Sequence, residues 1–373
     1  MVDKKRLVES FMELVKIDSI SGEEKNLADF LVEKLKELGL EVRVDRAGEK
    51  AESDSGNVIA YLRGDAKEAV PILFSAHMDT VVPGKNIKPK FDGNKITSSG
   101  DTILGADDKA AIAAILEALR IINENNISHG DIEIVFSICE EIGLLGAKNL
   151  DISSLKARMA FVLDSGGQVG KIINEAPYHN DIKIVIYGKA AHAGANPEEG
   201  INAIKVAGVA LSRMALGRLE EDTTANIGII SGGKASNIVP DEVILKGELR
   251  SKSEEKLEKY TSELKQVIET TVQEFNARTE VKVERGYYGY HLSADSEVIK
   301  TAIKAAEEID LKPVLLPSGG GSDANVFNRL GFPATNLAIG IEKAHTVEEY
   351  IMVDSLIKSV EYILSIIKTA ASA

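Results

Sequence analysis

Two adjacent acids, Glu140 and Glu141, follow a short apolar run at 132–138. The β-branched and aromatic residues of this run predict a buried strand. Carboxylates at the end of such a strand are costly to desolvate unless a positive group meets them. Neighbouring side chains in extended chain point to opposite faces, so we expect one acid to bind something while the other acts. On this stretch alone, a solvated turn between strand and helix is the better explanation.

The same arrangement recurs after two further apolar runs. The run 71–76 leads into His77 and Asp79, and the run 159–163 leads into Asp164. In an α/β sheet, ligands bind at the carboxyl ends of the strands, because the loops there meet at one crevice. Three strands that each deliver a His or an acid to this edge therefore indicate a common site.

Two more candidates are Asp107, at the start of a predicted helix, and His345, in a loop before the last predicted helix. The full candidate set is His77, Asp107, Glu140, Glu141, Asp164 and His345. Nitrogen and carboxylate ligands without a thiolate suit zinc, and also cobalt or manganese. Each residue has an ordinary explanation singly, but one metal site explains all six together. Because so many acids would over-supply one ion, the count favours two ions that share a carboxylate.

Composition limits the class of protein. A chain of 373 residues, 44% of them hydrophobic, can bury a full-sized core in one or, more readily, two domains. With 44 basic and 58 acidic residues, the net charge of −14 argues against nucleic-acid binding. The single Cys139 excludes an intrachain disulfide framework and a cysteine-ligated zinc site. We see no signal peptide and no apolar stretch long enough to cross a bilayer, and expect a cytoplasmic protein.

Apolar strands alternate with amphipathic helices over most of the chain, which predicts an α/β fold with a mostly parallel central sheet flanked by helices. Between residues 177 and 288 the pattern changes to β-α-β-β-α-β, typical of an α+β split βαβ sandwich. We therefore expect one discontinuous domain, residues 1–176 and 289–373, with a second domain, residues 177–288, inserted into it.

Several segments, in chain order, resemble those of one enzyme family. They are FSAHMDTV, LLGADDKAAIAAIL, CEEIGLLGAKNLD, FVLDSGG, AAHAG, SNIVPD, GGGSDAN and the late His345. Over nearly the whole chain they resemble the peptidase T-like branch, the tripeptide aminopeptidases, of the dizinc aminoacylase/carboxypeptidase metallopeptidase superfamily. The resemblance implies that the discontinuous domain is a catalytic zinc-peptidase-like domain. It also implies that the inserted domain is a lid, through which such chains form homodimers.

The resemblance further implies a role for each candidate metal ligand. His77 and Asp164 bind one zinc, Glu141 and His345 bind the other, and Asp107 bridges both. The peptide bond that follows Asp107 is implied to be cis.

The resemblance also implies the residues that act on the substrate. Glu140 is the general base, which takes a proton from metal-activated water and returns it to the leaving nitrogen. Asp79 accepts a hydrogen bond from the other nitrogen of His77 and so fixes its tautomer. His192, in the lid, stabilises the oxyanion, often from a partner subunit. Without the resemblance, a surface loop is the better explanation of His192.

Four residues are expected to contact the substrate. Asn237 and Arg250, in the lid, are assigned to the substrate terminus, because an Arg can bind a carboxylate bidentately. An ordinary charge at a strand end explains Arg250 equally well. Gly321 and Ser322 match a family loop that lines the pocket, whereas Asp323 is expected to cap a helix.

The sequence thus predicts a dizinc peptidase that acts on short peptides, as an aminopeptidase of tripeptides. A carboxypeptidase or an N-acyl-amino-acid deacylase would use the same centre and is the main alternative. The segment GIISGGKA, residues 228–235, is close to a P-loop, but Ala235 replaces the hydroxyl residue that binds magnesium. A nucleotide-binding protein and a non-catalytic metal-binding protein are therefore distant alternatives.

Overall fold

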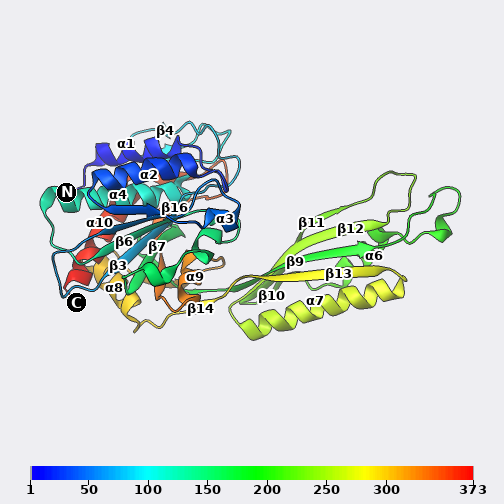
Figure 1. Cartoon of the computed structure of the whole chain (residues 1–373). Helices are drawn as coiled ribbons and strands as arrows, with labels where there is room; N and C mark the ends of the chain where they lie inside the picture. The colour runs from blue at the N-terminus through cyan, green and yellow to red at the C-terminus, as the bar shows by residue number, and fades with distance from the viewer. Residues whose placement is uncertain (1, 373) are drawn as a thin grey trace. The chain divides into compact units, whose positions relative to one another are not determined.

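The computed structural model describes residues 2–372 and divides into two compact units, each with its own buried apolar core. The first unit comprises Met1–Glu175 and His291–Ala373, and the second comprises Ala176–Tyr290. Figure 1 shows the second unit as an insertion between two parts of the first unit's chain. The predicted fold class, an α/β fold with an inserted α+β domain, is confirmed.

The first unit alternates helices with strands. Its helices are α1 (Lys4–Val15), α2 (Lys25–Glu37), α3 (Gly48–Ala51), α4 (Ala106–Asn125), α5 (Leu145–Lys148), α8 (Glu297–Glu307), α9 (Asp323–Arg329) and α10 (Val353–Ala371). Its strands are β1 (Glu41–Val44), β2 (Val58–Leu62), β3 (Ile72–His77), β4 (Lys90–Phe91), β5 (Lys95–Thr97), β6 (Ile132–Ser137), β7 (Met159–Gly166), β8 (Lys171–Ala176), β15 (Val314–Pro317), β16 (Ala334–Glu342) and β17 (Tyr350–Met352), with β14 (Tyr290–His291) at the border. Among the described residues, no helix has both the length and the apolar content needed to span a bilayer.

Four parallel strands form the centre of the first unit's sheet. Along the order β1-β2-β6-β3-β7-β16-β17-β5-β4, the neighbours β6, β3, β7 and β16 run in the same direction. β3 and β6 are buried along their whole length, and for this reason they appear in the sequence as nearly continuous apolar runs. Because the four strands are parallel, the loops that follow them meet at one edge of the sheet.

Helix α4 holds the segment that carries Asp107 against this sheet. It packs on β3, β7 and β16 through a buried stretch rich in Ala and Ile. Helix α1 packs on α4, where Arg6 Nη2 lies 2.6 Å from Oε1 of the fully buried Glu117. In the view of Figure 1, α1, α2 and α4 lie together above the sheet. The helix that begins at the candidate site is therefore fixed by packing on both sides.

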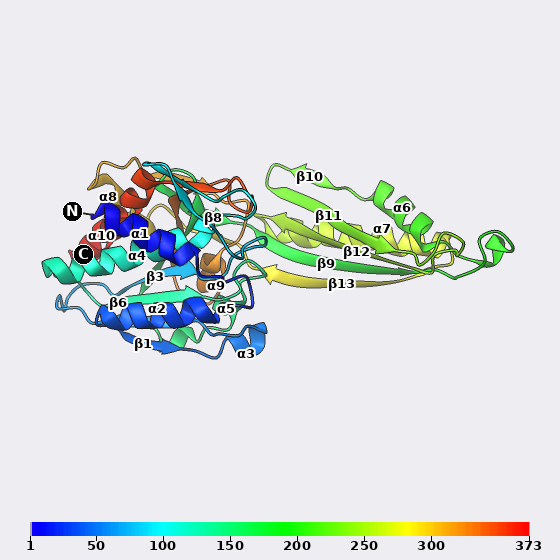
Figure 2. The ribbon, with the colours of Figure 1, turned by 90° about the horizontal axis from the view of Figure 1, so that it is seen from above.

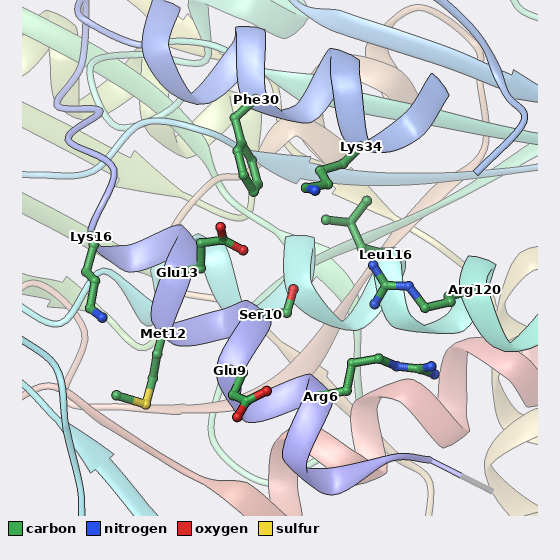
Figure 3. A pocket seen from close by; sticks show the side chains of 10 residues that line it. All are labelled: Arg6, Glu9, Ser10, Met12, Glu13, Lys16, Phe30, Lys34, Leu116 and Arg120. Atoms are coloured by element: carbon green, nitrogen blue, oxygen red, sulfur yellow. The ribbon is translucent and has the colours of Figure 1, made fainter. Parts of the chain in front are cut away.

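A hollow of about 540 Å³ lies between α1, α2 and α4. Its lining combines the cationic side chains of Arg6, Lys34 and Arg120 with the apolar side chains of Phe30 and Leu116 (Figure 3). None of the residues predicted to do chemistry contributes to this lining. The hollow is therefore separate from the candidate site at the strand ends.

The second unit is a five-stranded antiparallel sheet covered by two helices. It consists of β9 (Tyr178–Tyr187), α6 (Ala203–Arg213), β10 (Gly217–Glu220), β11 (Thr223–Gly232), β12 (Glu242–Ser251), α7 (Glu254–Glu274) and β13 (Arg278–Tyr287). The strand order is β10-β11-β12-β9-β13. Helices α6 and α7 contact each other and also β9 and β12, so they share one face of the sheet (Figures 1 and 2).

The predicted order β-α-β-β-α-β is observed, with one strand added. The added strand, β10, has four residues, of which only Leu219 is a large apolar residue, so its sequence carries almost no strand signal. The P-loop-like segment 228–235 forms the end of β11 and the loop after it, and no helix begins there. The segment therefore lacks the helix start on which a P-loop depends, which agrees with nucleotide binding being a distant alternative.

Candidate metal centre

Five of the predicted residues meet at the carboxyl edge of the four parallel strands. His77 is the last residue of β3, Asp164 lies near the end of β7, and Glu141 lies four residues beyond β6. His345 follows β16 in the next loop, and Asp107 lies in the first turn of α4. The parallel sheet therefore brings together residues that are separated by more than half of the sequence.

The carboxylate of Asp107 lies between two imidazoles. Its Oδ1 is 3.1 Å from Nε2 of His77, and its Oδ2 is 3.3 Å from Nε2 of His345. His77 Nε2 also lies 3.9 Å from Asp164 Oδ1, and His345 Nε2 lies 2.8 Å from Glu141 Oε1. Nε2 of each imidazole thus faces Asp107 and one further carboxylate, and Nδ1 of His77 lies 3.5 Å from Oδ1 of Asp79. The peptide bond Asp107–Asp108 is cis, which confirms that expectation.

The donor set of this cluster fits a divalent metal. His77 Nδ1 lies 2.9 Å from the main-chain oxygen of Asp79, which can only accept, so Nδ1 carries the hydrogen. In the neutral ring, Nε2 then directs a lone pair at two carboxylates, an arrangement that is stable only with a cation between them. Glu141 Oε1 is buried without a hydrogen bond, although His345 Nε2 is close to it. Ligand atoms of His77, Asp107 and Glu141 lie within 4.8 Å of one another.

The acids and imidazoles shift one another's ionisation. The nearby carboxylates of Asp107 and Glu141 raise the pKa of His345 to about 10. Burial raises the pKa of Asp107, but hydrogen bonds from His345 and His77 outweigh it and hold this pKa well below its usual range. The cluster therefore strongly favours positive charge at its centre. When no metal is bound, protons on the imidazoles supply this charge.

Glu140 differs from the ligand acids in its surroundings. Its side chain is buried, and burial, followed by the nearby charge of Asp164, raises the pKa of the Glu140 carboxyl well above its usual range. A carboxyl with a raised pKa can both take and return a proton near neutral pH. Glu140 is therefore suited to proton transfer.

The turn that carries Glu140 and Glu141 is held by Asp79. The Asp79 carboxylate accepts hydrogen bonds from the backbone N–H groups of Glu140 (2.8 Å) and Glu141 (3.2 Å), and from the hydroxyl of Ser21 (2.6 Å). The expectation that the two acids lie in extended chain is wrong, because β6 ends at Ser137. The division between the two acids therefore comes from a turn and not from strand geometry.

Sequence reasoning missed three buried acids around the cluster and misjudged a fourth. The three are Glu24, Asp108 and Glu349, and the fourth is Asp323. Glu24 Oε1 accepts from the backbone N–H of Cys139 (3.0 Å), and Asp108 Oδ2 accepts from that of His77 (3.1 Å). Asp323 does begin α9, but its Oδ2 also accepts from the hydroxyl of Ser137 (2.5 Å). Asp108 and Glu349 could have been found, since they are acids within four residues of predicted ligands.

The loop predicted to line the pocket lies directly before α9. Ser322 is buried at the helix start, and its backbone N–H donates to the side chain of Asn325 (3.0 Å). Gly321 precedes it and is half-buried. Asp323, the next residue, reaches the end of β6 through Ser137. The backbone of this loop is therefore anchored beside the strand that leads to Glu140.

The second unit holds the other three predicted residues, at two ends of its sheet. His192 and Asn237 belong to neighbouring loops, in which the backbone N–H of Ala193 donates to the main-chain oxygen of Asn237 (3.0 Å). Arg250 is paired with His179 near the other end of β12. Arg250 lies eight positions along β12 from Glu242, where the strand begins, which is roughly 26 Å. One copy of the unit therefore does not bring Arg250 together with His192 and Asn237.

Comparison with known proteins points to one family. The model for peptidase family M20/M25/M40 matches residues 73–369. A structure of aminopeptidase PepT from Bacillus cereus ATCC 10987 is 43% identical, covers 99% of each chain and superposes with a TM-score of 0.90. A tripeptidase structure from Staphylococcus aureus subsp. aureus Mu50 is 41% identical, covers 100% of each chain and has a TM-score of 0.95. Peptidase T from Clostridium perfringens (strain ATCC 13124) is 31% identical over 98% of this chain and 99% of its own.

Metal binding is expected to release protons. The pKa of His345 is raised to about 10, so the metal-free protein carries a proton there throughout the neutral range. A metal ligand must be neutral imidazole, so binding displaces this proton, and the apparent affinity rises at least about tenfold per pH unit until the pH reaches that pKa. Calorimetric titration with Zn²⁺, in buffers of different ionisation enthalpy between about pH 6 and pH 8, measures the release. Affinity that does not depend on pH, with no proton released, would show that His345 is not a ligand of the bound metal.

Proposed function

Because the chain belongs to peptidase family M20/M25/M40, we propose that it is a dizinc aminopeptidase that hydrolyses tripeptides. Membership of this family makes the protein a hydrolase of peptides. The single observation that carries the proposed mechanism is the position of the Asp107 carboxylate between His77 and His345. Such a carboxylate can serve two metal ions at once.

The proposed ligands divide into two sets around Asp107. His77 and Asp164 would hold one ion, Glu141 and His345 would hold the other, and Asp107 would serve both. When bound, such ions polarise the scissile carbonyl and lower the pKa of water, which supplies a nucleophile at neutral pH. Oxygen and nitrogen donors suit Zn²⁺ first, with Co²⁺ and Mn²⁺ as alternatives.

Glu140 is the proposed general base and acid. It accepts the proton of the attacking water and then donates it to the nitrogen of the leaving amine, so the amide bond is cleaved without release of a strong base. Asp79 supports this step from two sides. Its main-chain oxygen fixes the tautomer of His77, and its carboxylate holds the backbone of Glu140 and Glu141.

His192 is the proposed donor to the developing oxyanion. Its Nδ1 accepts from the backbone N–H groups of Gly194 (3.1 Å) and Ala195 (3.0 Å), so the ring hydrogen resides on Nε2. A neutral imidazole with its N–H directed away from its own loop can donate to an oxyanion. The hydrogen bonds of this loop therefore support the role that the family resemblance implies.

The preference for tripeptides rests on relatives, because the tripeptidase and the Peptidase T sequence above cover almost the whole chain. Asn237 and Arg250 are proposed to bind the substrate terminus. Arg250 Nη2 already donates to Glu248 (2.9 Å), which orients the guanidinium. Gly321 and Ser322 are proposed to line the pocket.

A homodimer through the inserted lid domain, residues 177–288, is part of the proposal. In the described chain, β10 pairs only with the first residues of β11, so the edge of β11 from Asn226 onward lacks a neighbouring strand on that side. Ile229 and Ile230 on this stretch are 55% and 56% exposed. A second copy would cover this apolar edge, and an antiparallel pair would bring the Arg250 end of one sheet towards the His192 end of the other. A cytoplasmic location also remains a prediction.

The substrate class can be tested with peptides whose termini are free or blocked. We expect cleavage of tripeptides with a free amine, release of the amino-terminal residue, and loss of activity after chelation with recovery on adding Zn²⁺, Co²⁺ or Mn²⁺. N-acetylated tripeptides and C-terminally amidated tripeptides are the matched controls. Activity restricted to N-acylated substrates would instead identify a deacylase or carboxypeptidase, and would refute the aminopeptidase assignment.

The role of Glu140 predicts a separation of metal binding from turnover. Glu140→Ala should retain the metal content of the wild type and lower kcat by about 10²- to 10⁴-fold, the range expected for loss of a general base. Glu13→Ala, in the hollow shown in Figure 3, is the control and should leave kcat unchanged. Metal content by mass spectrometry and steady-state kinetics distinguish the outcomes. Near wild-type turnover of Glu140→Ala would remove Glu140 from the mechanism.

The dimer predicts that a charge on the edge of β11 disrupts association. Ile230→Lys should convert a dimer to a monomer in analytical ultracentrifugation, because a buried lysine at an edge strand opposes pairing. Leu330→Lys, at an exposed apolar position of the first unit, is the control. If the wild type sediments as a monomer at all concentrations, the dimer is excluded.

A further inference from the structure

Glu349 makes three hydrogen bonds to the backbone that leads into Asp107. Its side chain is buried, with 1% of its surface exposed. Oε2 accepts from the N–H groups of Leu104 (2.7 Å) and Gly105 (2.8 Å), and Oε1 accepts from the N–H of Asp107 itself (2.9 Å). Both oxygens of the carboxylate are therefore used, and all three donors belong to one four-residue segment.

This segment cannot satisfy these N–H groups by itself. The first N–H groups of a helix have no partner within the helix, and here the backbone of Asp107 is not helical, with φ −82° and ψ 99°. Gly105 has φ +72°, a left-handed conformation that turns the chain before α4. A buried donor without a partner is costly, so the segment depends on an acceptor from elsewhere in the fold.

The acceptor comes from the segment that carries His345. Glu349 lies four residues after His345, and its own N–H donates to the main-chain oxygen of Thr346 (3.1 Å). Strand β17 begins at the next residue and pairs with β16 and β5, which fixes the end of this loop to the sheet. Glu349 therefore joins the loop of His345 to the loop of Asp107. His345 Nε2 and Asp107 Oδ2 lie 3.3 Å apart.

We propose that Glu349 is a positioning residue, which sets the separation of Asp107 and His345 so that both can hold the same metal ion. This inference rests on the proposed function, since it presumes that these two residues are metal ligands. It assigns no contact with substrate to Glu349. Its specific consequence concerns affinity: loss of the carboxylate weakens binding of the ion at Asp107, Glu141 and His345 more than binding of the ion on the side of His77.

The substitution Glu349→Gln tests this with little change in volume. A glutamine has one acceptor oxygen and one NH₂ group, so at least one of the three backbone donors must face a donor. Glu133 provides a matched control. It is also buried, and its Oε2 accepts from the backbone N–H groups of Lys156 and Ala157 (both 2.8 Å). It lies at the amino end of β6, opposite the end that leads to Glu140.

The experiment is a titration of the metal-free full-length proteins with Co²⁺. Binding is monitored by the absorption of the bound ion, and affinities are measured by competition with a chelator. We expect the wild type and Glu133→Gln to bind two ions. Glu349→Gln should bind one ion with wild-type affinity and the other about 10- to 100-fold more weakly, as found for partners that orient metal ligands. If Glu349→Gln binds each of the two ions as tightly as the wild type does, the role of Glu349 is refuted. A wild type that binds no Co²⁺ would refute the proposed metal centre itself.

Circular dichroism and thermal unfolding of the metal-free proteins show whether Glu349→Gln folds. If it does not fold, Glu349→Asp is titrated instead, because it keeps the charge but is too short to reach all three donors. A selective loss of affinity for one ion in Glu349→Asp supports the proposal, and wild-type affinity for both ions overturns it.

Discussion

The arrangement of this site depends on one carboxylate held between two imidazoles. Asp107 offers Oδ1 to His77 and Oδ2 to His345, and Nε2 of each imidazole faces a second carboxylate, that of Asp164 or Glu141. Bringing these acids together in a buried site is unfavourable unless positive charge is placed among them. The fold must therefore supply rigid support for every one of these groups, because small displacements would leave buried charges unpaired.

The parallel sheet supplies the first part of that support. Strands β3, β6, β7 and β16 are neighbours in register, so their carboxyl ends form one edge irrespective of how far apart they lie in the sequence. Helix α4 then places Asp107 in the middle of that edge by packing on β3, β7 and β16. Each ligand thus lies at the end of a buried and well-packed element, and the loops have to position only the last few residues.

Ligands were easier to predict from the sequence than the acids that support them. Buried parallel strands must be apolar throughout, so an acid or a His at the end of such a run stands out, as His77 and Asp164 do. Glu24 and Glu349 are equally buried, and each accepts backbone N–H groups in loops that carry ligands. Asp79 was predicted beside His77, but its hydrogen bonds to the backbone of Glu140 and Glu141 were not. Which main-chain donors are left unpaired is decided by the tertiary fold, and a one-dimensional pattern does not contain this information. The short polar strand β10 was missed for the same reason, because pairing with a distant strand and not local composition defines it.

The supporting acids and the ligand acids make metal binding and folding interdependent. The supporting acids accept hydrogen bonds from backbone N–H groups, so contacts within the fold hold the loops that carry the ligands. The ligand acids lack such donors in sufficient number, as the buried Glu141 Oε1 without a hydrogen bond illustrates. A metal that binds only the folded chain then stabilises it further, by an amount that grows with the free metal concentration. The supporting acids thus determine the geometry of the site, and the bound cation offsets the cost of concentrating negative charge within it.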